Sequence, residues 1–155
     1  DLTARSVSEH ALLFEEFLVR EAEAGRLSLP LGPVAAKAVL HGHCHQKAFD
    51  AVSPARAVLQ LIPGLKVDLV ESSCCGMAGS FGYDAAHFDV SMRMAELALL
   101  PAVRHADAGT LIVADGTSCR HQIADGTRAS GAREAVHVAR VLARALAPAA
   151  PPTVA

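Results

Sequence analysis

All four cysteines of this chain lie in three short segments that are rich in histidine, glycine and polar residues. Cys44 lies in the first segment, the adjacent pair Cys74 and Cys75 in the second, and Cys119 in the third. Four thiolates are a complete ligand set for a tetrahedral zinc ion or for an iron–sulfur cluster. The sequence has none of the C-x-x-C pairs of zinc fingers and ribbons. The fold must therefore bring these cysteines together.

Disulfide bonds are the other common use of four cysteines. A bond between the neighbours Cys74 and Cys75 would be strained, and no charged-then-apolar export leader opens the sequence. We therefore expect a cytoplasmic protein in which the thiols bind metal or do redox chemistry. Two adjacent cysteines reach different iron atoms of a cluster more easily than two corners of one zinc site, which favours a cluster. Since the chain begins at Asp1, we also expect a piece of a longer polypeptide or a processed chain.

Alternating apolar runs and amphipathic stretches define the elements that must position the cysteines. Strands are predicted at residues 37–41, 66–71 and 110–114. Helices are predicted from Ser6 to a stop at Gly25, over 53–62, over 84–99 with a break or restart at Pro101, near 120–124 and over 133–146. This alternation predicts an α/β fold, a small three-layer sandwich with a mainly parallel sheet. We expect one domain over 1–146 and a flexible tail over 147–155.

Each cysteine segment directly follows a predicted strand. Parallel strands place their carboxyl ends on one edge of the sheet, where ligands usually bind. The three segments should therefore be neighbours, and the sequence predicts a cysteine site at this edge.

Other residues of these segments are suited to support such a site. Gly76, Gly79 and Gly82 let the backbone approach a bulky anionic cofactor and direct N–H groups at it. A phosphate-binding loop is the alternative, but its glycine–lysine pattern is absent. His41, His43 and His45 alternate, so at least one of them should serve packing. The side chains that could act as alternative ligands or as hydrogen-bond donors to a cluster are His43, His45, Lys47, Arg120, His121 and Gln122.

Composition excludes several classes of function. The 155 residues are 52% hydrophobic and 19% charged, with a net charge of −2. The charged share is below the roughly 25% of ordinary domains, which suggests that a partner covers part of the surface. No basic patch indicates nucleic acid, and no apolar run reaches the ~20 residues of a membrane span.

The three segments resemble the cysteine-rich CCG domain. The resemblance covers about residues 36–146 and rests on HCHQK at 43–47, CCGMAGSFG at 74–82 and DGTSCRHQ at 115–122. That domain occurs in one subunit of heterodisulfide reductase, in the glycolate oxidase iron–sulfur subunit and in one subunit of anaerobic glycerol-3-phosphate dehydrogenase. The sequence is most similar to the C-terminal iron–sulfur part of FAD-linked oxidases of the D-2-hydroxyglutarate and D-lactate dehydrogenase kind.

The resemblance implies that Cys44, Cys74, Cys75 and Cys119 hold an iron–sulfur cluster, expected to be 4Fe–4S. The fuller family pattern has a further cysteine where this chain has Gln122. A four-cysteine cluster, a site completed by histidine, or a zinc ion therefore all remain open.

The implied function is electron transfer within a flavin-dependent 2-hydroxy-acid dehydrogenase. FAD would lie on another domain or subunit, with a ferredoxin-like domain as a further partner. The complex could pass electrons to a membrane acceptor, which would place the chain peripherally on the inner membrane. We expect no turnover from this chain alone.

Two other classes of function compete with this one. In the first, zinc-bound or metal-free thiols hold the loops of an interaction domain of the same kind of complex. In the second, Cys74 or Cys75 is a nucleophile that a histidine and the N–H groups of the glycine loop activate.

Overall fold

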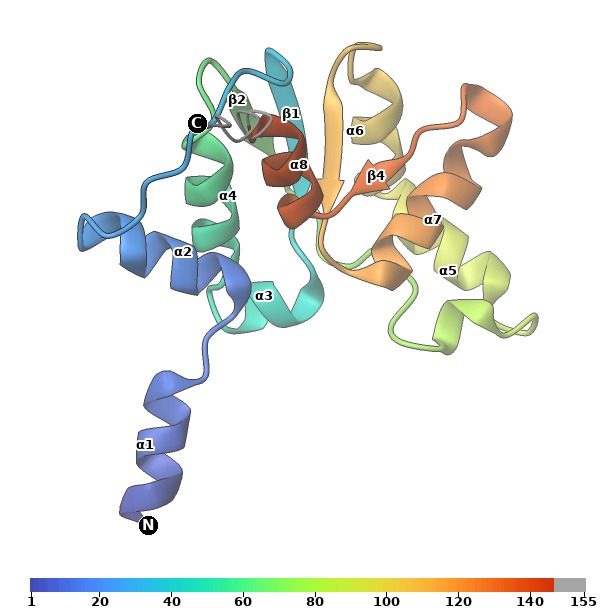
Figure 1. The fold of residues 1–155 in the computed structure, drawn as a ribbon. Coiled ribbons are helices and arrows are strands. Elements are labelled where there is room, and N and C mark those ends of the chain that lie inside the picture. Colours follow the sequence, from blue (N-terminus) through green and yellow to red (C-terminus); the bar gives the residue numbers. More distant parts are fainter. Residues whose placement is uncertain (147–155) are drawn as a thin grey trace, which may run out of the picture.

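Four parallel strands in the order β2-β1-β3-β4 form the centre of the computed structural model, which describes residues 1–146 (Figure 1). The strands are β1 Lys37–His41, β2 Lys66–Leu69, β3 Leu111–Ala114 and β4 Ala135–Val136. β1 and β3 are central: Val39 pairs with Asp68 of β2 on one side and with Ile112 of β3 on the other. The expected α/β fold with a mainly parallel sheet is confirmed.

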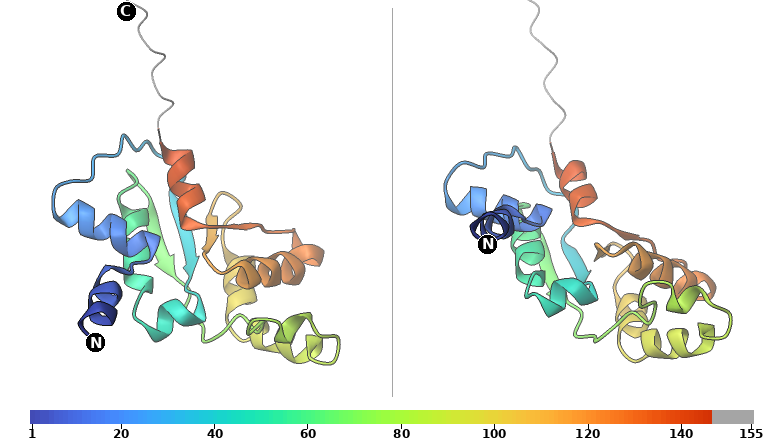
Figure 2. Two further views of the ribbon diagram at one scale, coloured as in Figure 1. Left: turned by 60° about the horizontal axis from the view of Figure 1, so that its bottom comes forward. Right: turned by 90° about the horizontal axis from the view of Figure 1, so that it is seen from below.

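Helices cover both faces of the sheet (Figure 2). The α-helices are α1 Leu2–His10, α2 Phe14–Glu23, α3 Cys44–Ala48, α4 Val52–Gln60, α5 Phe88–Glu96, α6 Leu99–His105, α7 Thr117–Thr127 and α8 Val138–Ala145, with 3-10 turns η1 Phe81–Tyr83 and η2 Arg128–Ser130. Within residues 1–146, no helix has both the length and the apolar character that crossing a bilayer requires. The proposed tail at 147–155 lies outside the described residues.

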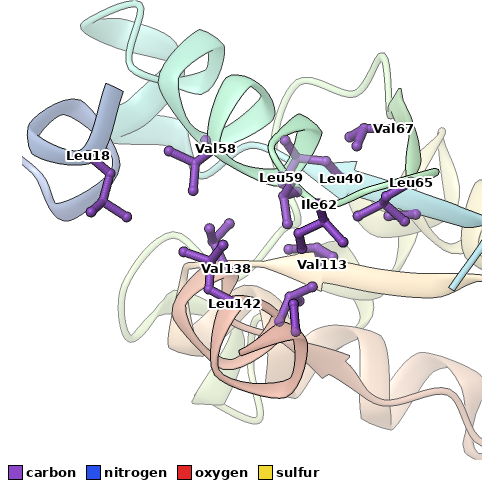
Figure 3. Close-up of a cluster of buried hydrophobic side chains, with 14 residues drawn as sticks. Leu18, Leu40, Val58, Leu59, Ile62, Leu65, Val67, Val113, Val138 and Leu142 are labelled. Atoms are coloured by element: carbon purple, nitrogen blue, oxygen red, sulfur yellow. The ribbon is translucent and has the colours of Figure 1, made fainter. Parts of the chain in front are cut away.

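Two apolar cores, one on each face, hold the layers together. On one face, Leu40 of β1 and Val113 of β3 pack against Leu59 of α4 and Val138 of α8 (Figure 3). On the other face, β3 and the helices α6 and α7 bury Ile112, Leu99, Val103 and Ile123. Successive residues of a strand point to opposite faces, so both faces of a central strand must be apolar. The three-layer arrangement follows from this pattern.

The amino-terminal region differs from the single helix expected there. The chain forms α1 and α2, separated at residues 11–13. The backbone N–H of Leu13 donates to Glu16 Oε2 at 2.7 Å, which caps the start of α2. α1 itself buries no residue. The predicted stop is correct, since Gly25 follows α2 with a left-handed φ of 67°.

The carboxyl-terminal helix begins later than predicted. Ala135 and Val136 pair with β3 as a short fourth strand, so α8 begins only at Val138. His137 caps the helix, because its Nδ1 accepts from the N–H of Ala139 at 3.1 Å. The spacing of apolar residues in the sequence did not distinguish the two edge-strand residues, Ala135 and Val136, from the first turn of a helix.

Two other predicted helices changed in extent, and one further helix was not predicted. The helix expected over 84–99 is α5, and the chain restarts as α6 two residues before Pro101, which lies in the first turn of that helix. The stretch near 120–124 is the longer α7, and α3 was not predicted.

Replacing leucine by alanine should lower the free energy of unfolding by different amounts at two paired strand positions. Leu40 is fully buried, whereas its register partner Leu69 is 43% exposed on the edge strand β2. We expect Leu40→Ala to lower the free energy of unfolding by about 2–5 kcal/mol and Leu69→Ala by less than about 1 kcal/mol. Denaturant titration measures both, and equal losses would contradict this assignment of the core.

Candidate metal centre

The structure gathers the four thiols at the carboxyl edge of the sheet. β1 leads to Cys44 at the start of α3, β2 leads to the loop with Cys74 and Cys75, and β3 leads to Cys119 in α7. Cys44 Sγ lies 3.5 Å from Cys74 Sγ, and the sulfur atoms of Cys75 and Cys119 lie within 4.8 Å of each other. All four cysteines are free thiols. The edge thus presents two thiol pairs, from three loops, to one region.

His41 is a further donor at this centre. Its ring is 1% exposed, and its Nδ1 lies 2.9 Å from Ser72 Oγ. Its Nε2 is buried and has no hydrogen-bond partner among the described residues. Ligand atoms of His41, Cys75 and Cys119 all lie within 4.8 Å of one another. A ring that donates from Nδ1 to Ser72 keeps a lone pair on Nε2, so the donor set fits a metal or cluster.

His41 was not among the ligands predicted from the sequence. Strand alternation could have identified it: Leu40 packs into the core on the α4 face, so His41 at the end of β1 must point to the opposite face. Cys75 and Cys119 belong to the core on that face.

The two buried thiols, Cys75 and Cys119, have pKa values that are shifted in opposite directions. The pKa of Cys75 is lowered to about 4, chiefly because hydrogen bonding from the neighbouring Cys119 thiol stabilises the thiolate, with a smaller effect from the backbone N–H of Met77. The same hydrogen bond, together with burial, raises the pKa of Cys119. Burial raises the pKa of Cys44 as well. A thiolate is therefore favoured at Cys75 without any metal.

Lys47 holds the second cysteine loop. Its Nζ donates to the Ser72 carbonyl and, at 3.0 Å, to the Ser73 carbonyl. Its positive charge acts to lower the pKa of Cys44. Lys47 thus fixes the backbone just before Cys74 and places a positive charge near the partly exposed thiols of Cys44 and Cys74, the outer thiol pair.

The glycine run contributes both a hydrogen bond and close packing. The N–H of Gly76 donates to Cys74 Sγ at 3.3 Å. A Cβ at Gly76 would lie 2.1 Å from the Ser91 carbonyl oxygen, and one at Gly82 would lie 2.4 Å from Ser91 Oγ. Gly79 has a left-handed φ of 68° and no atom near its Cβ position. Two of the three glycines therefore let α5 approach the cysteine loop.

Gln122, where the family pattern predicts a further cysteine, is buried and hydrogen-bonded within the fold. Its side chain is 2% exposed, and its Nε2 donates to the Ser91 carbonyl at 3.0 Å and to Ser91 Oγ at 2.9 Å. It joins α7 to α5 behind the cysteine loop.

The other predicted side chains mainly contact groups other than the thiols. The His43 ring packs against Gly116, and His43 Nδ1 accepts from the N–H of His45. A Cβ added at Gly116 would lie 2.9 Å from Cys119 Sγ, so Cys119 is also close to this glycine. His45 stacks edge-on against His43 at 5.2 Å. Arg120 donates to the carbonyls of Ala114 and Asp115. His121 is exposed, and its Nδ1 lies 2.6 Å from the Tyr83 hydroxyl.

The two kinds of glycine in the cysteine loop allow a matched test. Gly76→Ala forces a Cβ into the backbone of α5, and we expect it to cost about 3 kcal/mol or more. Gly79→Ala meets open space and should cost only the left-handed conformation, about 1–2 kcal/mol. Denaturant unfolding of the reduced protein measures the difference. Equal destabilisation would show that Gly76 does not mediate this contact.

Comparisons with known proteins include distant similarities to two dehydrogenases. The chain is 29% identical over 145 residues to a subunit of anaerobic glycerol-3-phosphate dehydrogenase of Escherichia coli K12, and equally to that of strain O157:H7. This match covers 92% of the chain and 34% of the relative. The chain is also 30% identical over 116 residues to D-2-hydroxyglutarate dehydrogenase of E. coli K12, covering 74% of the chain and 11% of that enzyme.

The chain therefore spans about a third of the length of the first relatives and a smaller part of the other. No profile of a known protein family matches the sequence. No solved structure matches it either. The distant similarity to dehydrogenase polypeptides agrees with a role in oxidation–reduction.

Proposed function

We propose that this chain is an electron-transfer module that binds an iron–sulfur cluster within a flavin-dependent dehydrogenase of hydroxy acids or related hydroxyl substrates. The observation that carries the proposal is the placement of four free thiols at one sheet edge, where ligand atoms of Cys75, Cys119 and His41 lie within 4.8 Å of one another and His41 Nε2 has no partner among the described residues. Donor sets of this kind bind iron–sulfur clusters or zinc. The similarity to two dehydrogenases supports the redox choice.

Different residues of the chain would bind such a group and adjust its properties. Cys44, Cys74, Cys75 and Cys119 would be its ligands, and His41 would complete or adjust the set. An iron–sulfur cluster, when bound, supplies a reversible one-electron centre. The Gly76 N–H donates to the sulfur of Cys74, and hydrogen bonds to ligand sulfurs raise the reduction potential. Cys75 and Cys119 are buried, whereas Cys44 and Cys74 are partly exposed. The outer pair is thus the side from which electrons would enter or leave.

The proposed partners are a flavin domain and a ferredoxin-like domain on the rest of the polypeptide or complex. One relative is named as a subunit, which supports assembly with other chains. α1 buries no residue and exposes Leu2 and Val7, as expected of an element that packs elsewhere. Attachment to an inner-membrane acceptor through that complex remains part of the proposal.

A structural zinc site is the second candidate. The mutual spacing of His41, Cys75 and Cys119, with all ligand atoms within 4.8 Å, also suits three corners of one tetrahedral ion. Such a site would fix the three loops without transferring electrons.

Chemical analysis distinguishes the two functions. We expect protein purified without oxygen to contain iron and acid-labile sulfide in a ratio near one, because the thiolates bind a cluster. Zinc without sulfide, after anaerobic reconstitution with iron and sulfide has also failed, would contradict the electron-transfer proposal.

Ligand variants should separate buried ligands from surrounding histidines. Cys75→Ser and Cys119→Ser should lower the iron retained per chain at least about tenfold, since each removes a ligand. His41→Gln should change the visible spectrum of the loaded protein. His121→Gln is the matched control, because this exposed ring contacts Tyr83 and not the thiols. A spectrum that changes equally in both histidine variants would remove His41 from the centre.

A further inference from the structure

A second group of metal-type ligands lies beside the cysteine centre but shares no residue with it. Glu15 comes from the first turn of α2, Asp115 follows the end of β3, and His137 caps α8. One ligand atom from each lies within 4.8 Å of the other two. All three residues line a cavity of about 850 Å³. Three elements distant in sequence thus bring two carboxylates and one imidazole to one point.

Asp115 and His137 are held in place by other groups. Asp115 Oδ1 accepts from the N–H of Val138 at 3.0 Å, and Oδ2 accepts from Gln46 Nε2 at 2.8 Å. His137 Nδ1 accepts from the N–H of Ala139 and lies 3.5 Å from Asp115 Oδ1. The single lone pair of Nδ1 is already used by the Ala139 N–H, so the ring would bind a cation through its other nitrogen, Nε2.

Glu15, by contrast, is buried with one carboxylate oxygen that no group among the described residues binds. It is 4% exposed, and its Oε1 is buried without a hydrogen-bond partner among residues 1–146. A buried carboxylate that lacks a partner is costly. The next residue, Glu16, lines the same cavity but is accounted for, since it caps the Leu13 N–H at the start of α2. Helix capping therefore explains Glu16 and leaves Glu15 unexplained.

We propose that Glu15, Asp115 and His137 form a binding site for one divalent cation, separate from the cysteine centre. Two carboxylates and an imidazole suit Mn²⁺, Fe²⁺ or Zn²⁺, whereas the thiolates of the neighbouring centre suit softer ions and clusters. The charge of the cation would neutralise both carboxylates and supply the missing partner of Glu15 Oε1. Gly116, the neighbour of Asp115, packs close to the His43 ring and to Cys119 Sγ.

The proposed ion would have a structural consequence. It would tie α2 to the end of β3 and to the start of α8, on the edge that carries the cysteines. Its remaining coordination positions would be open to water or to a small ligand in the cavity.

Manganese binding to the full 155-residue chain tests the proposal. Mn²⁺ is the probe because it prefers oxygen and nitrogen ligands over thiolates. Electron paramagnetic resonance (EPR) of free Mn²⁺, read during titration, should show one tight site per chain. Glu15→Gln should weaken binding about tenfold or more, because it removes a ligand. The matched control Glu16→Gln removes the same charge one residue away and should bind as the wild type does. Cys44→Ser should also keep the site.

Stability measurements give an independent result. Mn²⁺ should raise the melting temperature of the wild type but not that of Glu15→Gln. In chelator, Glu15→Gln should melt no lower than the wild type, because a neutral amide is less costly to bury. If that variant does not fold, the nitrogen coupling of bound Mn²⁺ in the wild type, and its absence in His137→Gln, provides the test. The proposal is overturned if the wild type binds no Mn²⁺, or if Glu16→Gln or Cys44→Ser loses binding as Glu15→Gln does.

Discussion

The shared direction of the strands is the constraint on which the rest of the structure depends. In the order β2-β1-β3-β4, β1 lies between the strands that lead to the other two cysteine loops. Parallel pairing therefore places the carboxyl ends of β1, β2 and β3 side by side, and with them all four cysteines. Reversing any one of these strands would carry its thiols to the opposite edge. The site is a property of the whole sheet and not of a local motif.

Packing on both faces keeps this edge in register. Apolar residues of α4 and α8 hold one face, and α6 and α7 hold the other. On the second face the core itself includes Cys75 and Cys119, so the buried ligands are also packing residues. Gly76 and Gln122, both in contact with Ser91, let α5 support the cysteine loop from behind. A substitution in this core should therefore also change the positions of the Cys75 and Cys119 thiols.

The sheet and the meeting of the cysteines could be predicted from the sequence, because both follow from strong local signals. The apolar runs of β1, β2 and β3 are short and bounded, and each cysteine loop follows one of them. The two residues of β4 could not be found in this way, since their pairing with β3 depends on the finished sheet. The break between α1 and α2 depends on one capping bond from Leu13 to Glu16, inside a continuous amphipathic pattern.

Long-range geometry explains the site residues that were missed. His41 alternates with two other histidines, and only the packing of Leu40 shows which face it takes. Glu15 and His137 are ordinary helix-end residues in sequence, and only the docking of α2 and α8 brings them to Asp115. For the cysteines, spacing after strands was sufficient. For single residues from distant helices, no local signal exists.

The EPR spectrum of the anaerobically purified chain, before and after reduction with dithionite, tests the central claim most directly. A cluster that transfers electrons changes its spin state when it gains one electron. We expect a cluster signal that is present in only one of the two oxidation states and that follows reduction and reoxidation reversibly. A protein with no cluster signal in either state, while zinc fills the thiols, would contradict the electron-transfer function.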